Sequence, residues 1–258
     1  MEKSFTSVCN KLTEIKFLKN EIEETTKEKK RKLLERIELN LNSNRLSATN
    51  FFCYSPYSNE LTRLGYKEET IETRMITLDS YYNKQCLWLL VESYEAFDRY
   101  LKEFYEELIL IDESFSIKKK NSKEILKKLR SKIPNFKKME ISNNLGINFR
   151  LMIVLYSKIR HLVVHSDGIT ENKDEFIKKI LEEANILTKK EYSKHVSEQI
   201  DSFFELNTIM LKTIHFQGKD EFGIDTQIHT DRFNKLLDRL GGYILMIEIE
   251  MLKYLEKG

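Results

Sequence analysis

The sequence predicts an all-α protein. Turn-forming residues are scarce, with 8 glycines and 2 prolines among 258 residues, against typical usage of roughly 7% and 5%. Hydrophobic residues recur at spacings of three and four over most of the chain, which is the pattern of amphipathic helices. Because 41% of the residues are hydrophobic, a chain of this length can bury a substantial core. We therefore expect a bundle of long helices, with additional helices at both ends.

Composition also restricts the environment. The three cysteines, Cys9, Cys53 and Cys86, are odd in number and widely spaced, which favours a reducing compartment over a disulfide framework or a cysteine metal site. The N-terminus lacks the apolar core of a signal peptide, and no apolar run approaches the roughly 20 residues of a membrane span. We expect a cytoplasmic protein without membrane contact. Since the net charge is only +2, any nucleic-acid surface must come from local asymmetry.

The N-terminal part is expected to form an extension, residues 1–60, to a main helical domain, residues 61–258. Within it, residues 5–41 have helical periodicity, and the charge-rich stretch 21–32 is explained better by a solvated face than by an interaction arm. Asparagine, serine and proline interrupt this pattern over residues 42–59 and predict a connection. Its aromatic residues are expected to pack on the core, with stacking on bases as the alternative; they are Phe51, Phe52, Tyr54 and Tyr57.

The second helical stretch covers residues 66–112. One straight helix of this length would run about 70 Å, so a break near Asp79-Ser80 is expected. Trp88, the single tryptophan, lies in an apolar block and is expected in the core. Three carboxylates, Glu92, Glu95 and Asp98, have two interpretations: they are surface residues, or one of them, Glu92 or Glu95 in particular, orients the arginine and histidines described below.

A strongly basic segment spans residues 118–138, with ten basic residues and one acidic residue. Residues 120–133 within it have the periodicity of an amphipathic helix with a basic outer face. Such a face can serve solubility, or it can bind a polyanion such as RNA, DNA or an acidic protein. The candidate RNA-binding residues are Lys118, Lys119, Lys120, Lys123, Lys127, Lys128, Arg130 and Lys132.

The rest of the chain predicts four further helices. Residues 147–165 form the most apolar one, which we expect to be central and buried on most sides. The other three are expected over residues 173–185, 189–215 and 232–256, with a loop over 216–231. Gly241-Gly242 in the last helix costs helix stability, about 1 kcal/mol per glycine. Close approach of another helix, from this chain or a second subunit, would explain their presence.

One stretch at the end of the central helix combines an arginine with two of the five histidines. On a helix, Arg160, His161 and His165 lie at about 0°, 100° and 140° and share one edge. A permanent cation beside imidazoles that titrate near neutrality suits work on a phosphodiester. The following Ser166-Asp167-Gly168 stops a helix.

Two other interpretations of this stretch remain. His161 and His165, at i and i+4, have the spacing of a metal-binding pair, but Leu162 follows His161 where a metalloprotease helix has its glutamate, so we expect no metal. Alternatively, the arginine and histidines only cap the C-terminal end of a buried helix, where the dipole favours cations.

The same residues carry a family resemblance. Arg160, the polar His161, three apolar residues and His165 resemble the R-x4-6-H motif of HEPN domains, which are all-α, often dimeric modules of bacterial toxins, phage-defence proteins and CRISPR-associated ribonucleases. The aromatic stretch 85–101 is similar to the long helix that precedes the motif helix in that family. The resemblance covers about residues 70–190 and excludes residues 1–60.

The resemblance implies a metal-independent endoribonuclease without a cofactor, in which two subunits form a composite site. Arg160 would hold the phosphate, His165 would take the proton of the ribose 2′-hydroxyl, and His161 would orient these groups or bind the phosphate. The implied partners are RNA, a second copy of the chain and an antitoxin or defence-system protein. A non-catalytic HEPN-like module that binds RNA or a nucleotide, or acts as a scaffold, is the alternative.

Overall fold

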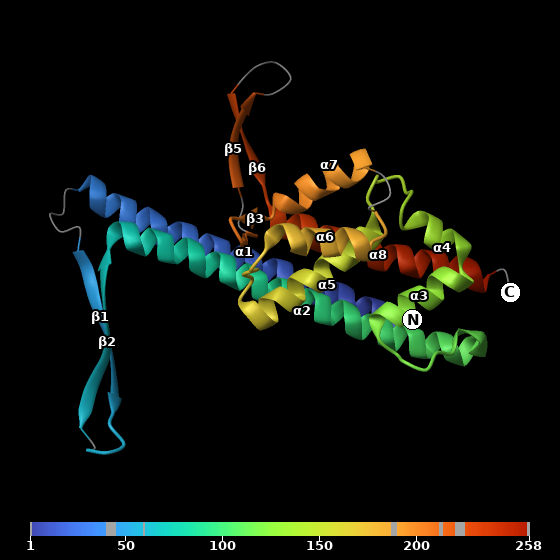
Figure 1. The fold of residues 1–258 in the computed structure, drawn as a ribbon, viewed down its shortest axis with the longest axis horizontal. Coiled ribbons are helices and arrows are strands. Elements are labelled where there is room, and N and C mark those ends of the chain that lie inside the picture. The colour runs from blue at the N-terminus through green and yellow to red at the C-terminus, as the bar shows by residue number, and fades with distance from the viewer. Residues whose placement is uncertain are drawn as a thin grey trace. The chain divides into compact units, whose positions relative to one another are not determined.

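The computed structural model describes residues 2–39, 45–58, 60–186, 190–211, 214–219 and 225–256. Most of these residues are helical, so the all-α prediction is confirmed. The helices are α1 (Glu2–Glu38), α2 (Ile71–Ile111), the short η1 (Glu113–Phe115), α3 (Ser122–Lys132), α4 (Pro134–Met139), α5 (Phe149–Ser166), α6 (Lys173–Glu183), α7 (Lys190–Asp201) and α8 (Arg232–Leu255) (Figure 1). The strands form antiparallel pairs: β1 (Arg45–Tyr54) with β2 (Leu61–Thr70), β3 (Phe204–Glu205) with β4 (Thr208–Ile209), and β5 (Ile214–Lys219) with β6 (Asp225–Thr230).

The chain divides into two compact units. The first unit joins Met1–Lys19 to Cys86–Gly258, and the second unit is Asn20–Gln85. Both α1 and α2 therefore contribute residues to both units. The boundary expected at residue 60 falls between β1 and β2, inside the second unit.

The second unit contains a long hairpin where the sequence predicts a connection. β1 pairs with β2 over its length, with register irregularities at Arg45/Ser47 and Phe51/Phe52. The aromatic residues expected to pack on the core are exposed instead, by between 47% and 99%; they are Phe51, Phe52, Tyr54 and Tyr57. The expected connection contains a strand because the strand propensity of its aromatic residues outweighs the turn propensity of its Asn and Ser residues. Asn42, Ser43, Asn44 and Asn59, part of that prediction, lie outside the described residues.

Helix α2 starts later than predicted and has no break. Its first turn is closed by a reciprocal cap in which the Thr70 and Thr73 hydroxyls accept the backbone N–H groups of Thr73 and Thr70 at 3.1 and 2.9 Å. The helix then continues through Asp79 and Ser80 to Ile111, so the expected break is absent. Trp88 is 44% exposed, which corrects its expected place in the core.

The core of the first unit is built around α2, α5 and α8. Tyr243 of α8 is fully buried, and its ring centroid lies 5.5 Å from Phe149, 5.9 Å from Phe97 and 6.1 Å from Phe136. Four elements thus meet at one aromatic cluster. The expected close approach of another helix is found at only one of the two glycines of α8. A Cβ atom at Gly242 would lie 3.5 Å from the Phe149 ring of α5, whereas a Cβ atom at Gly241 would have no atom of another described element within 4 Å.

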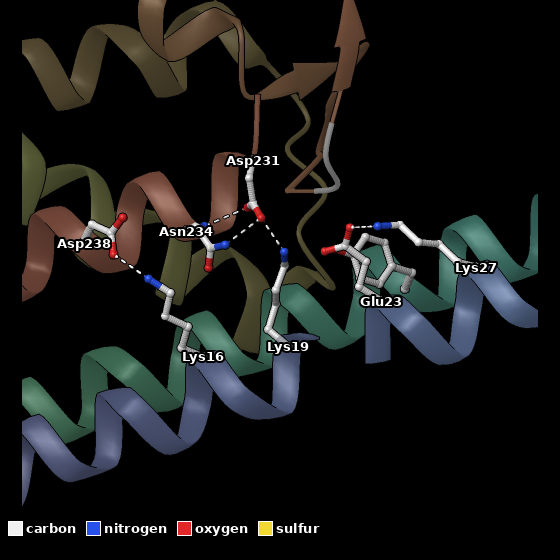
Figure 2. Close-up of polar contacts among 8 residues, drawn as sticks. Lys16, Lys19, Glu23, Lys27, Asp231, Asn234 and Asp238 are labelled. Carbon is white, nitrogen blue, oxygen red and sulfur yellow. Dashed lines mark hydrogen bonds and ion pairs between the residues drawn. The ribbon is translucent and has the colours of Figure 1, made fainter. Parts of the chain in front are cut away.

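Two ion pairs connect α1 to α8 within the first unit (Figure 2). The Lys19 side chain is almost fully buried and its ammonium pairs with Asp231, whereas the exposed pair Lys16–Asp238 has a distance of 3.2 Å. Asp231 also caps α8, accepting the Asn234 backbone N–H at 2.8 Å and the Asn234 amide at 2.8 Å. The buried ammonium is thus held at a helix start.

The prediction of a single helix over residues 189–215 is wrong. Helix α7 ends at Asp201, and the tight turn between β3 and β4 follows, with Leu206 at a φ of 56°. The residues predicted to be apolar and buried, Val196, Ile200 and Ile209, are all buried. However, a turn separates Ile200 from Ile209, so they do not share one helix. Residues 216–231, predicted as a loop, contain β5 and β6 where they are described.

No described helix combines the length and the apolar character that crossing a membrane requires.

Candidate functional site

Helix α5 carries the arginine and histidines, and its ends are well defined. At its start the Asn148 side chain accepts the Leu151 backbone N–H at 3.0 Å. At its end Asp167 and Gly168 adopt positive φ values of 50° and 81°, and both backbone N–H groups bond to the Leu162 carbonyl, at 3.2 Å for Gly168. The Ser-Asp-Gly sequence therefore stops the helix as predicted, through its backbone.

Tertiary contacts hold this stop in place. The Gly168 carbonyl accepts the Ile209 N–H at 2.9 Å, and the Thr170 N–H bonds to the Asn207 carbonyl at 2.9 Å, so the β3–β4 turn fixes the chain that leaves α5. A Cβ at Gly168 would lie 3.0 Å from Leu87 Cδ1 of α2. The glycine is thus required both by its backbone conformation and by close approach of α2.

Arg160 is paired with Glu95 of α2. Its Nε atom donates a hydrogen bond to Glu95 Oε1 at 2.7 Å, and its Nη2 atom forms an ion pair with the same oxygen at 2.6 Å. Of the two carboxylates expected to orient the site, Glu95 therefore contacts the arginine, whereas Glu92 pairs with Lys11 at 2.7 Å. The Arg160 and Glu95 side chains are 37% and 45% exposed, and pairs this exposed contribute about 0–1 kcal/mol. A ligand anion can therefore replace Glu95 at little cost.

His161 and His165 lie one above the other on the exposed side of α5. Their ring centroids are 4.4 Å apart, with the planes inclined by 50°. Among the described residues no side chain is hydrogen-bonded to either ring, and no group of three or more His, Cys, Asp and Glu residues is arranged to hold a metal ion. Both imidazoles are thus open to solvent and to a substrate.

The geometry bears on the capping interpretation. Arg160 turns towards α2 instead of bonding the last carbonyls of α5, and the Leu162 carbonyl is satisfied by backbone N–H groups. Only His165 lies in the last turn, where a positive charge would be favoured by the helix dipole. Capping therefore does not account for Arg160.

Tyr94 of α2 and Ser157 of α5 form a hydrogen bond near Arg160, whose charge acts on the Tyr94 hydroxyl. Burial raises the pKa of the Tyr94 hydroxyl, and a hydrogen bond with Ser157 opposes this shift. The Tyr94 ring stacks on Tyr156 with centroids 6.3 Å apart. Ser157 precedes Arg160 by about one helical turn, so its place beside Arg160 can be predicted from the sequence of α5. The place of Tyr94 near Arg160 cannot, because it depends on how α2 packs against α5.

The basic segment covers α3, α4 and the chain before them, and its charges are partly neutralised. Lys118 and Lys119 are exposed, Lys128 and Lys132 are half-buried, and three lysines pair with glutamates: Lys120 with Glu106 at 3.3 Å, Lys123 with Glu183 at 2.8 Å and Lys127 with Glu124 at 3.7 Å. The segment remains a cationic surface, but its effective charge is smaller than the sequence suggests.

Arg130 differs from the other candidate RNA-binding residues. Its Nε and Nη2 atoms donate to the two oxygens of Glu140, at 2.6 and 2.8 Å, and its side chain is only 19% exposed. Tyr243 donates to the same carboxylate at 2.5 Å. Arg130 therefore belongs to a buried polar cluster instead of the outer face on which the sequence predicts it.

Comparisons of the chain with protein-family models, with curated proteins and with solved structures find no match.

Proposed function

We propose that this protein is a metal-independent, HEPN-like endoribonuclease whose reacting groups are on α5. The observation that carries the proposal is that the last turns of α5 hold Arg160, its guanidinium oriented by Glu95, together with the exposed His161 and His165. A fixed cation beside two open imidazoles supplies both the charge stabilisation and the proton transfer that phosphodiester cleavage needs.

Arg160 binds the scissile phosphate. Its Nε and Nη2 atoms hold the guanidinium plane against Glu95, while Nη1 bonds no described residue. The exposed pair is weak enough for a phosphate to displace the carboxylate, and a guanidinium binds a phosphate in the fork geometry that stabilises charge on its oxygens. Glu95 is then a positioning residue that keeps Arg160 at the helix edge in the free protein.

The imidazoles move protons. His165 takes the proton of a ribose 2′-hydroxyl, the hydroxyl oxygen attacks phosphorus, and the bond from phosphorus to the 5′-oxygen breaks as a second imidazole donates a proton to that oxygen. The products are a 2′,3′-cyclic phosphate and a 5′-hydroxyl. The second imidazole is His165 of another copy of the chain, and His161 binds the phosphate beside it.

A dimer is part of the proposal, and exposed apolar side chains near the motif support it. Val164 is 40% exposed on α5 between the two histidines, and Ile169 just beyond the helix is 53% exposed. Trp88 of α2, next to the Leu87 that contacts Gly168, is 44% exposed. Exposed apolar side chains on α5, just after it and on α2 are suited to burial against a second copy.

One observation favours a second candidate, a non-catalytic module that binds RNA or a nucleotide. No described side chain orients either imidazole, whereas a histidine that acts as a general base is commonly held by a hydrogen bond to its other nitrogen. In this case Arg160 and the basic segment bind RNA, and the histidines only contact it.

Purified protein incubated with end-labelled RNA in EDTA separates the two functions. We expect cleavage by the wild type, products that end in a 2′,3′-cyclic phosphate, and a loss of at least about 100-fold in rate for Arg160→Ala and for His165→Ala, the scale of a general acid–base contribution. Binding without cleavage by the wild type would support the non-catalytic module.

The chain offers matched controls for this assay. His195 is an exposed histidine on α7, and Arg99 is an exposed arginine one turn from Glu95 on α2. His195→Ala and Arg99→Ala should cleave like the wild type. If Arg160→Ala and His165→Ala cleave as fast as these controls, the site assignment is wrong.

A further inference from the structure

A groove of about 330 Å³ lies between α3 and α5 of the first unit. Its apolar wall is formed by Leu126 of α3 together with Ile153 and Val154 of α5, and Tyr94 and Ser157 add hydroxyl groups at one side. We refer to it as the α3–α5 groove. This lining, apolar with a few polar groups, suits a ligand that has a flat apolar part and a charged part.

The charged part must be an anion. Four cations and one carboxylate, Glu183, line the groove. Glu183 holds Lys123, and Glu140 holds Arg130. The Lys127 side chain is 75% exposed, and its ion pair with Glu124 is long at 3.7 Å and therefore weak. Arg150 is half-buried and lines the groove without a hydrogen bond or ion pair to any residue in the described ranges. Arg150 and Lys127 are therefore available to bind a phosphate.

The groove and the candidate active site both lie along α5. Arg150, Val154, Ser157 and His161 recur at spacings of four, three and four, so they follow one face of the helix. From Val154 to His161 the helix rises about 10 Å, roughly the length of three stacked nucleotides at about 3.4 Å each. A strand whose phosphate lies at Arg160 therefore reaches the groove within a few nucleotides.

We infer that the α3–α5 groove binds one nucleotide of the RNA chain, close to the bond at the Arg-His site. Its phosphate lies on Arg150 and Lys127, and its base packs on the apolar wall formed by Leu126, Ile153 and Val154. The choice of an RNA chain as ligand rests on the proposed ribonuclease function; the position of the phosphate and base rests on the groove itself.

The test compares two double variants that remove the same charge. Arg150→Ala with Lys127→Ala changes the groove, whereas Lys137→Ala with Lys138→Ala removes two exposed lysines from α4. Each is made in His165→Ala protein, and binding of a short single-stranded RNA is measured by fluorescence anisotropy. We expect the groove variant to bind RNA about tenfold more weakly than the α4 variant, the scale of one charge-assisted hydrogen bond.

A second ligand and a third variant test whether the groove binds the base of the nucleotide. Inorganic polyphosphate has charge but no bases, so both double variants should lose affinity for it equally. Val154→Phe fills the groove without changing charge and should weaken RNA binding while leaving polyphosphate binding unchanged. Thermal unfolding close to that of the parent protein would show that each variant is folded.

The outcomes separate this inference from the proposed function. If the wild type cleaves RNA but the two double variants bind RNA equally, the groove inference fails alone. If the groove variant is selectively weakened but the wild type leaves RNA intact, the ribonuclease proposal fails and the groove inference stands. A groove that binds AMP but no RNA would overturn the assignment to an RNA chain.

Discussion

Glu140 is a buried charged residue that pairs with Arg130 of α3. Its side chain is 1% exposed, and it accepts two hydrogen bonds from Arg130 and one from Tyr243. Burial raises the pKa of Tyr243 well above its usual value, with the Glu140 carboxylate adding to the effect, so the phenol stays protonated and continues to donate. The three groups form one satisfied polar cluster within the core.

Arg130→Ala should destabilise the protein by about 3–5 kcal/mol, because it leaves the Glu140 carboxylate buried without its cation. Chemical denaturation followed by circular dichroism measures this loss. Lys127→Ala removes an equal charge from a side chain that is 75% exposed and should change stability by no more than about 0.5 kcal/mol. Equal stability of the two variants would contradict a structural role for Arg130.

Glu248 provides a pH-dependent prediction. Burial raises the pKa of this carboxyl above its ordinary value of 4.5, although a hydrogen bond from Tyr100 opposes the shift; that bond is 2.9 Å long. Folding therefore favours the neutral acid. The stabilising contribution is complete below about pH 4.5 and is lost as the pH rises through the raised pKa.

Glu248→Gln, which stays neutral, should therefore gain stability relative to the wild type as the pH increases from about 4 to about 8. The measurement is the difference in Tm between the two proteins at each pH. Glu103→Gln, at an exposed position on α2, serves as the control and should show no such trend. A difference for Glu248→Gln that stays constant or shrinks towards high pH would rule out the raised pKa.

At the scale of elements, α1 and α8 are joined by one buried and one exposed ion pair (Figure 2). Asp231→Ala leaves the Lys19 ammonium buried without this carboxylate and removes the cap of α8, so we expect a loss of about 3–5 kcal/mol. Asp238→Ala breaks the exposed pair with Lys16 and should cost about 0–1 kcal/mol. Urea denaturation compares them, and a similar loss in both would mean that burial of Lys19 does not matter.

Helical periodicity located most elements, and it failed where the chain needs a different geometry. α3, α5, α6 and α8 lie within two residues of their predicted ranges, because each has a long apolar face that only a helix can bury on one side. The β1–β2 hairpin was missed because its exposed side chains give no alternating apolar face. The β3–β4 turn was missed because each of its strands has only 2 residues.

At the scale of the whole molecule, the proposed composite site requires a second copy of the chain. Val164→Asp places a charge among the exposed apolar residues beside the histidines, and we expect it to weaken dimer formation by at least about tenfold. Light scattering over a range of protein concentrations measures the effect, and RNA cleavage should fall with dimer content.

Leu110→Asp is the matched control for this experiment, because Leu110 is 86% exposed near the end of α2, about 33 Å along that helix from Trp88. It should assemble like the wild type. A wild-type protein that is monomeric at micromolar concentration would contradict the composite site directly.

The sequence by itself determined the all-α class, the ends of α5 and the shared edge of Arg160, His161 and His165. These follow from local rules, since 3.6 residues per turn fixes which side chains share a face and Ser-Asp-Gly supplies the backbone conformations that end a helix. The family resemblance depends on the same local spacing and stays a prediction.

Only the tertiary structure decided which partners these residues have. Glu95, 65 residues before Arg160, pairs with it, whereas the equally plausible Glu92 pairs with Lys11. Arg130 lies inward on Glu140 and Arg150 lines the α3–α5 groove. The physical reason is that partner choice depends on the register between packed helices, and that register is set by how whole side-chain surfaces interlock.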